Sequence, residues 1–140
     1  MFITIQDYAT VCDERELEVL QNADNTIRES AEKVALDEVA SYLRTRYDVQ
    51  KTYSQTGDER NAYLVQIVAN IALYYLSKRL PQKMAGQKRA ELYDQAIDWL
   101  KLVGSGKAMP DLPVATTPDG KPTTGFPVLM DSLPRQKYDW

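Results

Sequence analysis

The feature that most constrains the fold of this sequence is a long run without charged side chains, from Asn61 to Ser77. On a helical wheel at about 100° per residue, its polar residues Gln66, Asn70 and Ser77 gather in one narrow stripe. Apolar side chains cover the remaining directions, and a helix of that kind has to be enclosed by other elements. The run therefore predicts the central helix of a small all-α domain.

A membrane-spanning helix is the alternative interpretation of the same run. A span needs about 20 predominantly apolar residues. This run is shorter and carries Gln66 and Asn70 near its middle, where polar groups are costly in a bilayer. We therefore expect an enclosed helix and no contact with a membrane.

The composition is that of an ordinary globular protein. With 140 residues, 44% of them hydrophobic and 26% charged, the chain is expected to form one domain with room for an appendage. A net charge of −3 argues against a general nucleic-acid binder, although a chain with negative net charge can still carry a local basic patch. The polar residues after Ile3 give no sign of a secretory signal, so we expect synthesis in the cytoplasm.

The scarcity of histidine and cysteine limits the chemistry that this chain can perform. The sequence contains no histidine and one cysteine, Cys12. This excludes Ser-His-Asp triads, Cys-His pairs, histidine-ligated zinc and an internal disulfide. The glycines are dispersed rather than gathered in a phosphate-binding loop. We therefore expect no enzyme, no cofactor and no metal site.

Two short helices and a longer one are predicted before the central helix. Thr4 with Asp7, and Asp13 with Glu16, have the spacing of capping boxes, so the segment 1–24 should form two short helical pieces. A second long helix should run from near Asn25 to about residue 47.

Glu38 falls inside the apolar arc of that helix, and two interpretations remain open. In the first, the apolar arc shifts gradually around the helix over six turns, so that Glu38 lies at its edge in contact with water. Alternatively, Glu38 is a buried carboxylate paired with an arginine or a tyrosine hydroxyl, because unpaired burial of a charge is costly.

The segments on either side of the central helix are predicted to be loops. The stretch 48–57 is polar and ends at Gly57, and Leu80-Pro81 should stop the central helix because proline biases its predecessor out of the helix. The following join is basic and has no acid. It is either a solvated surface loop or a contact with phosphate or with an acidic partner surface. Its cations are Lys78, Arg79, Lys83, Lys88 and Arg89.

The last helix, from about Gln87 to Val103, is amphipathic and should end at Gly104 in a left-handed C-cap. Six of the seven prolines follow it. This divides the chain into a helical domain, 1–106, and an extended arm, 107–140, because helix cannot persist through such spacing. The arm carries apolar residues that a plain flexible tail does not need, and we favour their binding to a neighbouring subunit over packing on the chain's own helices. They include Phe126, Val128, Leu129, Met130, Tyr138 and Trp140.

At this point the order of the parts resembles a known family. The stretches ITIQDYATVCDERELEVL, YLRTRY, LVQIVANIALYYLSKR and RAELYDQAIDWLKLVGSGKAMPDLP are similar to a Mu-like prophage family, formerly a domain of unknown function. That family is grouped with the head–tail connector proteins of tailed phages, also called head-completion or adaptor proteins. The resemblance covers residues 1–113 and departs in lacking a proline after Tyr47 and in the length of the arm.

The resemblance implies a structural virion protein rather than an enzyme. It implies a helical-bundle subunit of about four main helices plus short N-terminal helices, assembled commonly as twelve copies into a ring at the head–tail interface. The implied partners are further copies of the chain, the portal protein, and a tail or stopper protein, with DNA passing through the channel without sequence-specific binding. The competing hypothesis is a small helical regulator or nucleic-acid adaptor that uses the basic join.

Overall fold

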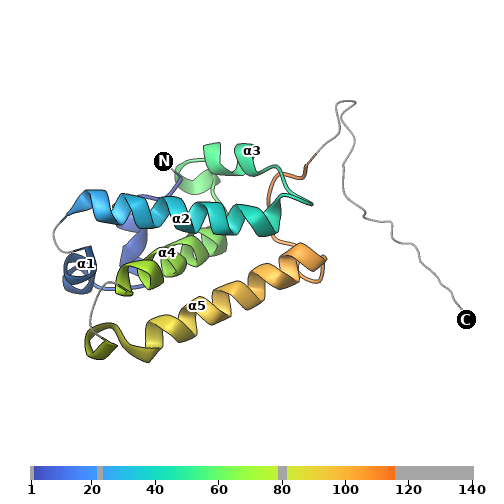
Figure 1. The fold of residues 1–140 in the computed structure, drawn as a ribbon. Coiled ribbons are helices and arrows are strands. Elements are labelled where there is room, and N and C mark those ends of the chain that lie inside the picture. Colours follow the sequence, from blue (N-terminus) through green and yellow to red (C-terminus); the bar gives the residue numbers. More distant parts are fainter. Residues whose placement is uncertain (1, 22–23, 79–81, 116–140) are drawn as a thin grey trace, which may run out of the picture.

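The structure, a computed structural model, describes residues 2–21, 24–78 and 82–115. Within these ranges the chain is helical and contains no β-strand, which confirms the predicted all-α class (Figure 1). The elements in chain order are η1 (Ile5–Thr10), α1 (Glu14–Gln21), α2 (Asn25–Leu43), α3 (Val49–Ser54), η2 (Gly57–Glu59), α4 (Ala62–Ser77) and α5 (Gln82–Ser105), where η denotes a 3-10 helix.

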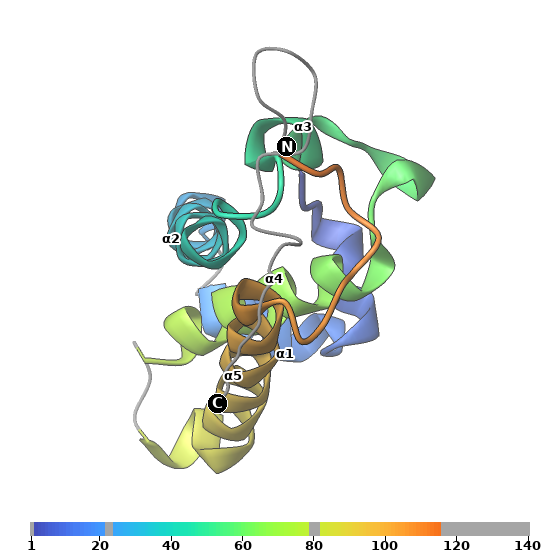
Figure 2. The same ribbon diagram turned by 90° about the vertical axis from the view of Figure 1, so that its right-hand side faces the viewer.

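The uncharged run forms α4, and α4 is the enclosed centre of the bundle, as predicted. It packs against α2 and α5 on two sides and against η1 and α1 on a third (Figures 1 and 2). Asn61 caps its first turn, since the Asn61 Oδ1 accepts a hydrogen bond of 3.0 Å from the Leu64 N–H. The most enclosed side chains of α4 have no exposed surface; they include Leu64, Val68, Ile71, Leu73 and Leu76.

Side-chain caps begin the first helices. The Thr4–Asp7 capping box is present, and the Glu16 N–H donates a bond of 2.7 Å to Asp13 Oδ1. Helix α2 starts after Asp24, whose Oδ1 accepts from the Thr26 N–H at 2.9 Å. It ends at Leu43, earlier than expected from the sequence.

The stretch 48–57, predicted to be a polar connection, instead contains α3 and the first residue of η2. Asp48 caps α3 through a 3.0 Å hydrogen bond from the Lys51 N–H. Thr52 is fully buried, and the Tyr53 hydroxyl donates to the Leu36 carbonyl at 2.6 Å. These contacts with α2 stabilise a helix that is too short to be stable alone.

Helix α5 begins earlier and ends later than predicted. Gly104 lies inside the helix against the Tyr42 carbonyl oxygen, which would be 3.3 Å from an added Cβ. The left-handed residue that follows the helix is Gly106, with φ of 84°, so the expected C-cap is displaced to this glycine.

The beginning of the predicted arm packs on the helical body. Tyr47 and Val114 form an isolated antiparallel bridge, flanked by hydrogen bonds from Asp48 N–H to the Pro113 carbonyl and from Ala115 N–H to the Arg46 carbonyl. Leu112 is 7% exposed. The body therefore extends through Ala115, beyond the predicted boundary at residue 106.

None of the helices in the described part of the chain combines the length and the apolar character that crossing a membrane requires.

Candidate interaction surfaces

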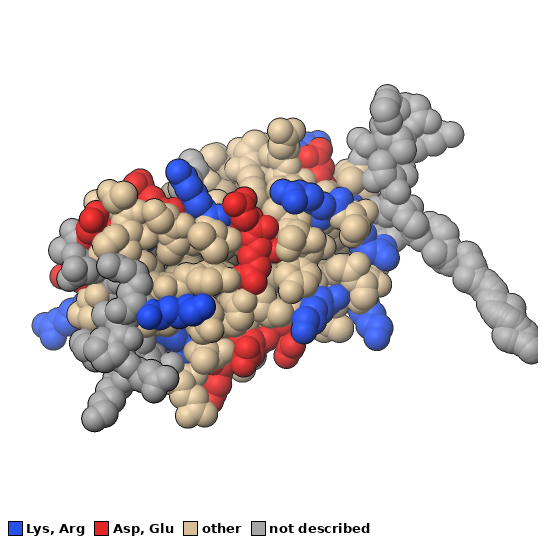
Figure 3. All heavy atoms as spheres, viewed as in Figure 1, with Lys and Arg blue, Asp and Glu red and all other residues tan. Residues whose placement is uncertain are grey.

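The structure separates the five cations of the predicted basic join. Lys78 and Lys88 are exposed. The Lys78 Nζ lies 5.3 Å from the ring centroids of both Tyr74 and Tyr75. Arg79 and the side chain of Lys83 lie outside the described residues. On the face seen in Figure 3, Lys and Arg side chains alternate with Asp and Glu rather than forming one basic field.

Arg89 is not available for the predicted contact with DNA or an acidic partner, because its side chain is buried inside the body and the residue is 2% exposed. The Arg89 Nε donates to Glu16 Oε2 at 3.0 Å, and Nη2 donates to the Val11 carbonyl at 3.1 Å. Arg89 therefore joins α5 to α1. We remove it from the predicted surface set.

Glu38 is a partly buried carboxylate paired with tyrosines, which decides between the two interpretations left open by the sequence. The hydroxyls of Tyr75 and Tyr93 each donate to one of its oxygens at 2.8 Å. Tyr93 also stacks on Tyr74 with ring centroids 4.0 Å apart. Burial, followed by the hydrogen bond to Glu38, raises the pKa of both Tyr75 and Tyr93 above the ordinary value. The cluster joins α2, α4 and α5.

A second buried carboxylate, Glu32, was not singled out from the sequence. It is 2% exposed, and its Oε2 accepts from the Tyr8 hydroxyl at 2.6 Å and from Arg28 Nε at 3.2 Å. Burial raises the pKa of Glu32 even though Tyr8 and Arg28 both favour its charged form. The spacing of Arg28 and Glu32 by four residues was the available sequence signal.

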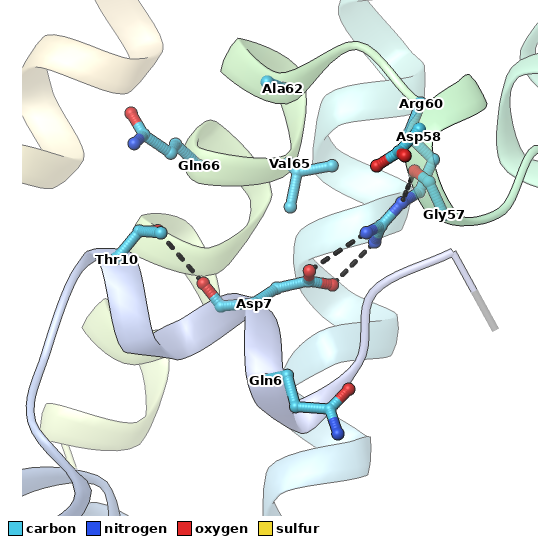
Figure 4. Close-up of a pocket in the computed structure, with 9 residues that line it drawn as sticks. All are labelled: Gln6, Asp7, Thr10, Gly57, Asp58, Arg60, Ala62, Val65 and Gln66. Atoms are coloured by element: carbon cyan, nitrogen blue, oxygen red, sulfur yellow. Dashed lines mark hydrogen bonds and ion pairs between the residues drawn. The ribbon is translucent and has the colours of Figure 1, made fainter.

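An ion pair between Asp7 and Arg60 attaches η1 to the start of α4 (Figure 4). Arg60 Nη1 and Nη2 donate to the two Asp7 oxygens at 2.6 and 3.0 Å. Arg60 also donates to the carbonyls of Phe2 and Gly57. Burial alone would raise the pKa of Asp7, but the bonds from Arg60 and Thr4 and the charge of Arg60 lower it below 3.8. A hollow of about 280 Å³ lies beside this pair. The pair in its wall therefore has a structural role, because it holds η1 against the start of α4.

A groove of about 480 Å³ lies between η1 and α1, and we call it the N-terminal groove. Its apolar lining includes Ile5, which is 48% exposed, and Leu17, which is buried. Gln21 also lines the groove and is 7% exposed, and its buried Oε1 has no hydrogen-bond partner. The remaining lining residues are Gln6, Tyr8, Ala9, Cys12, Asp13, Glu14 and Glu18.

A second apolar hollow, of about 340 Å³, lies between α2 and α4. Val34 lines it and is 48% exposed, and Tyr75 connects it to the Glu38 cluster. The other lining residues are Thr26, Ile27, Ser30, Ala31 and Leu76. We call it the α2–α4 hollow. Neither hollow was predicted from the sequence, because each is built by side chains of two separate elements.

The predicted partner-binding residues of the arm cannot be placed. Phe126, Val128, Leu129, Met130, Tyr138 and Trp140 all lie outside the described residues. In the described ranges, no three Cys, Asp or Glu side chains come together in an arrangement suited to a metal ion.

The family model described as "Bacteriophage Mu, Gp36" matches residues 2–128 of this chain. No curated protein and no solved structure gives a significant match.

Proposed function

The chain belongs to the bacteriophage Mu Gp36 family, and from this premise we propose that it is a structural virion protein, a head–tail connector subunit. Copies of the chain, commonly twelve, form a ring between the portal and the tail or its stopper, and DNA passes through that ring without sequence-specific binding. In this proposal the protein is not an enzyme, and it contacts no membrane.

The observation that carries the proposal is the presence of two separate apolar hollows on one small helical body. The N-terminal groove lies between η1 and α1, and the α2–α4 hollow lies between different elements. Each has a half-exposed hydrophobic side chain in its lining, Ile5 in one and Val34 in the other. A subunit of a closed ring meets two neighbours through two different surfaces, and a connector also meets the rings above and below it.

The alternative, a regulatory or nucleic-acid adaptor, depended on the basic join. Burial of Arg89 against Glu16 removes one of its five cations. On the one face seen in Figure 3, the described Lys and Arg side chains lie among Asp and Glu rather than in the continuous basic patch that favours phosphate binding. The connector is therefore the function that we favour.

The proposal is tested by mixing the full-length chain with the portal protein of the same phage. Mass photometry and negative-stain electron microscopy should then show a ring on the portal. Val34→Lys places a charge in the α2–α4 hollow without disturbing the core, because Val34 is half exposed. We expect about tenfold weaker assembly, which corresponds to about 1.4 kcal/mol.

The matched control is Gln50→Lys, which adds the same charge to the exposed side of α3. It should assemble like the unaltered chain. A chain that stays monomeric and does not bind the portal would contradict the connector function. Equal assembly of both variants would show that the α2–α4 hollow is not part of the interface.

A further inference from the structure

The N-terminal groove has the features of a site that is incomplete in the isolated subunit. Gln21 is more than nine-tenths buried, yet its Oε1 accepts no hydrogen bond. A buried acceptor without a donor costs about 1–3 kcal/mol, and native structures contain few of them. Gln21, a residue in the wall of the groove, therefore lacks a hydrogen-bond donor.

The lining of the groove indicates what kind of group would supply that donor. Ile5, Ala9 and Leu17 present apolar surface, which favours an apolar segment. Asp13, Glu14 and Glu18 are exposed acids around it, and they favour a segment that also carries positive charge. An extended peptide with apolar and basic side chains meets all of these requirements.

The chain itself contains such a peptide. The sequence after Ala115 includes the apolar stretch Phe126–Met130, followed by Arg135 and Lys137. Both basic side chains carry several N–H groups. These can donate hydrogen bonds to the carboxylates of the rim and to the unpaired amide oxygen. Proline-rich segments bind apolar grooves at low entropic cost because they are extended beforehand.

The positions of the groove and of Ala115 favour docking between copies. The Ala115 N–H donates to the Arg46 carbonyl, just beyond the C-terminal end of α2. Gln21 lies in the chain just before the N-terminal end of the same helix. Helix α2 has 19 residues and is about 28 Å long. Figure 1 shows α1 at one end of the body and the orange segment that leads to residue 115 at the other. A chain that leaves one end and binds the opposite end of its neighbour makes a head-to-tail contact, which closes into a ring when the rotation permits.

We propose that the N-terminal groove between η1 and α1 is the receiving site for the C-terminal arm, residues 116–140, of a neighbouring copy of the chain. The apolar stretch Phe126–Met130 occupies the groove, and Arg135 or Lys137 supplies charge and hydrogen-bond donors to its rim and to Gln21. The inference rests on the proposed ring and identifies the contact that links one subunit to the next.

The single cysteine of the chain provides a direct test, because Cys12 lines the groove. The Val128→Cys variant of the full-length chain adds one thiol to the arm. Burial raises the pKa of the Cys12 thiol to about 11, so little thiolate forms at neutral pH and copper–phenanthroline is added to catalyse oxidation by oxygen. The reaction is run on rings assembled with the portal protein and read on a non-reducing gel.

We expect a ladder of disulfide-linked oligomers that collapses to monomer on reduction. Met130→Cys should give the same ladder, and Cys12→Ser combined with Val128→Cys should abolish it. Lys121→Cys is the matched control in the arm, outside the apolar stretch, and should cross-link at least about fivefold less. Adding Glu18→Arg to Val128→Cys should slow cross-linking about tenfold, whereas adding Glu91→Arg, an exposed change on α5, should not.

The results separate this inference from the proposed function. Rings that form without a disulfide to Cys12 would overturn the inference and leave the connector function standing. A fast-migrating monomer with an internal disulfide would also overturn it, because the arm would then bind its own groove. A chain that neither assembles nor cross-links would contradict both proposals.

Discussion

At the scale of single residues, three side-chain contacts attach the N-terminal segment to the rest of the body. Asp7 binds Arg60, Glu16 binds Arg89, and the hydroxyl of Tyr8 binds Glu32. A partly buried ion pair adds little net stability because desolvation offsets much of the attraction, but removal of one partner leaves the other charge unpaired. Here the three contacts fix η1 and α1, which form the walls of the N-terminal groove.

The Asp7–Arg60 pair gives a prediction for the dependence of stability on pH. Because the folded-state pKa of Asp7 lies below 3.8, its contribution is present above about pH 4 and is lost as the pH falls through the folded value. Asp7→Asn should lower the free energy of unfolding at pH 7 by about 2 kcal/mol, the usual cost of losing hydrogen bonds to a charged group.

The same change should flatten the loss of stability that accompanies a fall in pH below about 4. Urea denaturation followed by circular dichroism, at several pH values, measures both effects. Asp94→Asn, an exposed change on α5, is the control and should leave the curve unaltered. An Asp7→Asn protein that loses stability in acid as steeply as the unaltered chain would contradict the assigned role.

Residue-level features were predictable from the sequence where the partners are close along the chain. The Thr4–Asp7 and Asp13–Glu16 pairs follow from local spacing. Glu38 was identified as unusual because it interrupts an apolar arc, although its tyrosine partners on α4 and α5 could only be named as a class. Arg89 was misplaced on the surface because its partner, Glu16, lies 73 residues away.

At the scale of elements, the long helices and the two short N-terminal ones were predictable, whereas the short helices between α2 and α4 were not. The uncharged run alone identifies α4, because a helix apolar on nearly every side must be enclosed. Helix α3 was predicted to be a loop, since its stability comes from burial of Thr52 and from the contact of Tyr53 with Leu36. Such support comes from tertiary contacts that no local pattern contains.

The segment 107–115 gives the prediction at this scale. Leu112 is 7% exposed, whereas Met109 in the same segment is 72% exposed. Leu112→Ala should destabilise the full-length protein by about 2–3 kcal/mol, because it removes buried methyl groups and leaves a cavity. Met109→Ala should change stability by less than about 0.5 kcal/mol.

Chemical denaturation of both variants measures these differences. An unchanged midpoint for Leu112→Ala would show that the segment is not part of the cooperative unit, and would return the domain boundary to residue 106.

At the scale of the whole molecule, the sequence indicates that there is a helical body and an arm, but not how the helices of the body are arranged in space. An all-α body followed by an apolar, proline-rich arm is evident from composition and periodicity. The N-terminal groove, the α2–α4 hollow and the separation of the groove from Ala115 by the length of α2 depend on how the helices pack. These are the features on which the proposed assembly depends.

Two truncations of the chain distinguish the body from the arm. A chain that ends after Ala115 keeps Leu112 and the bridge between Tyr47 and Val114, so its helical content and thermal midpoint should match those of the full-length protein. A chain that ends after Gly106 loses both contacts and should melt at a lower temperature. Circular dichroism during heating measures this difference.

Both truncations lack the residues proposed to bind the neighbouring groove, so both should fail to form rings on the portal in mass photometry. Because the longer truncation is expected to be as stable as the full-length chain, its failure to assemble would report on the arm rather than on unfolding. Ring formation by the chain that ends after Ala115, at the concentration used for the full-length protein, would show that the body alone carries the contacts between subunits.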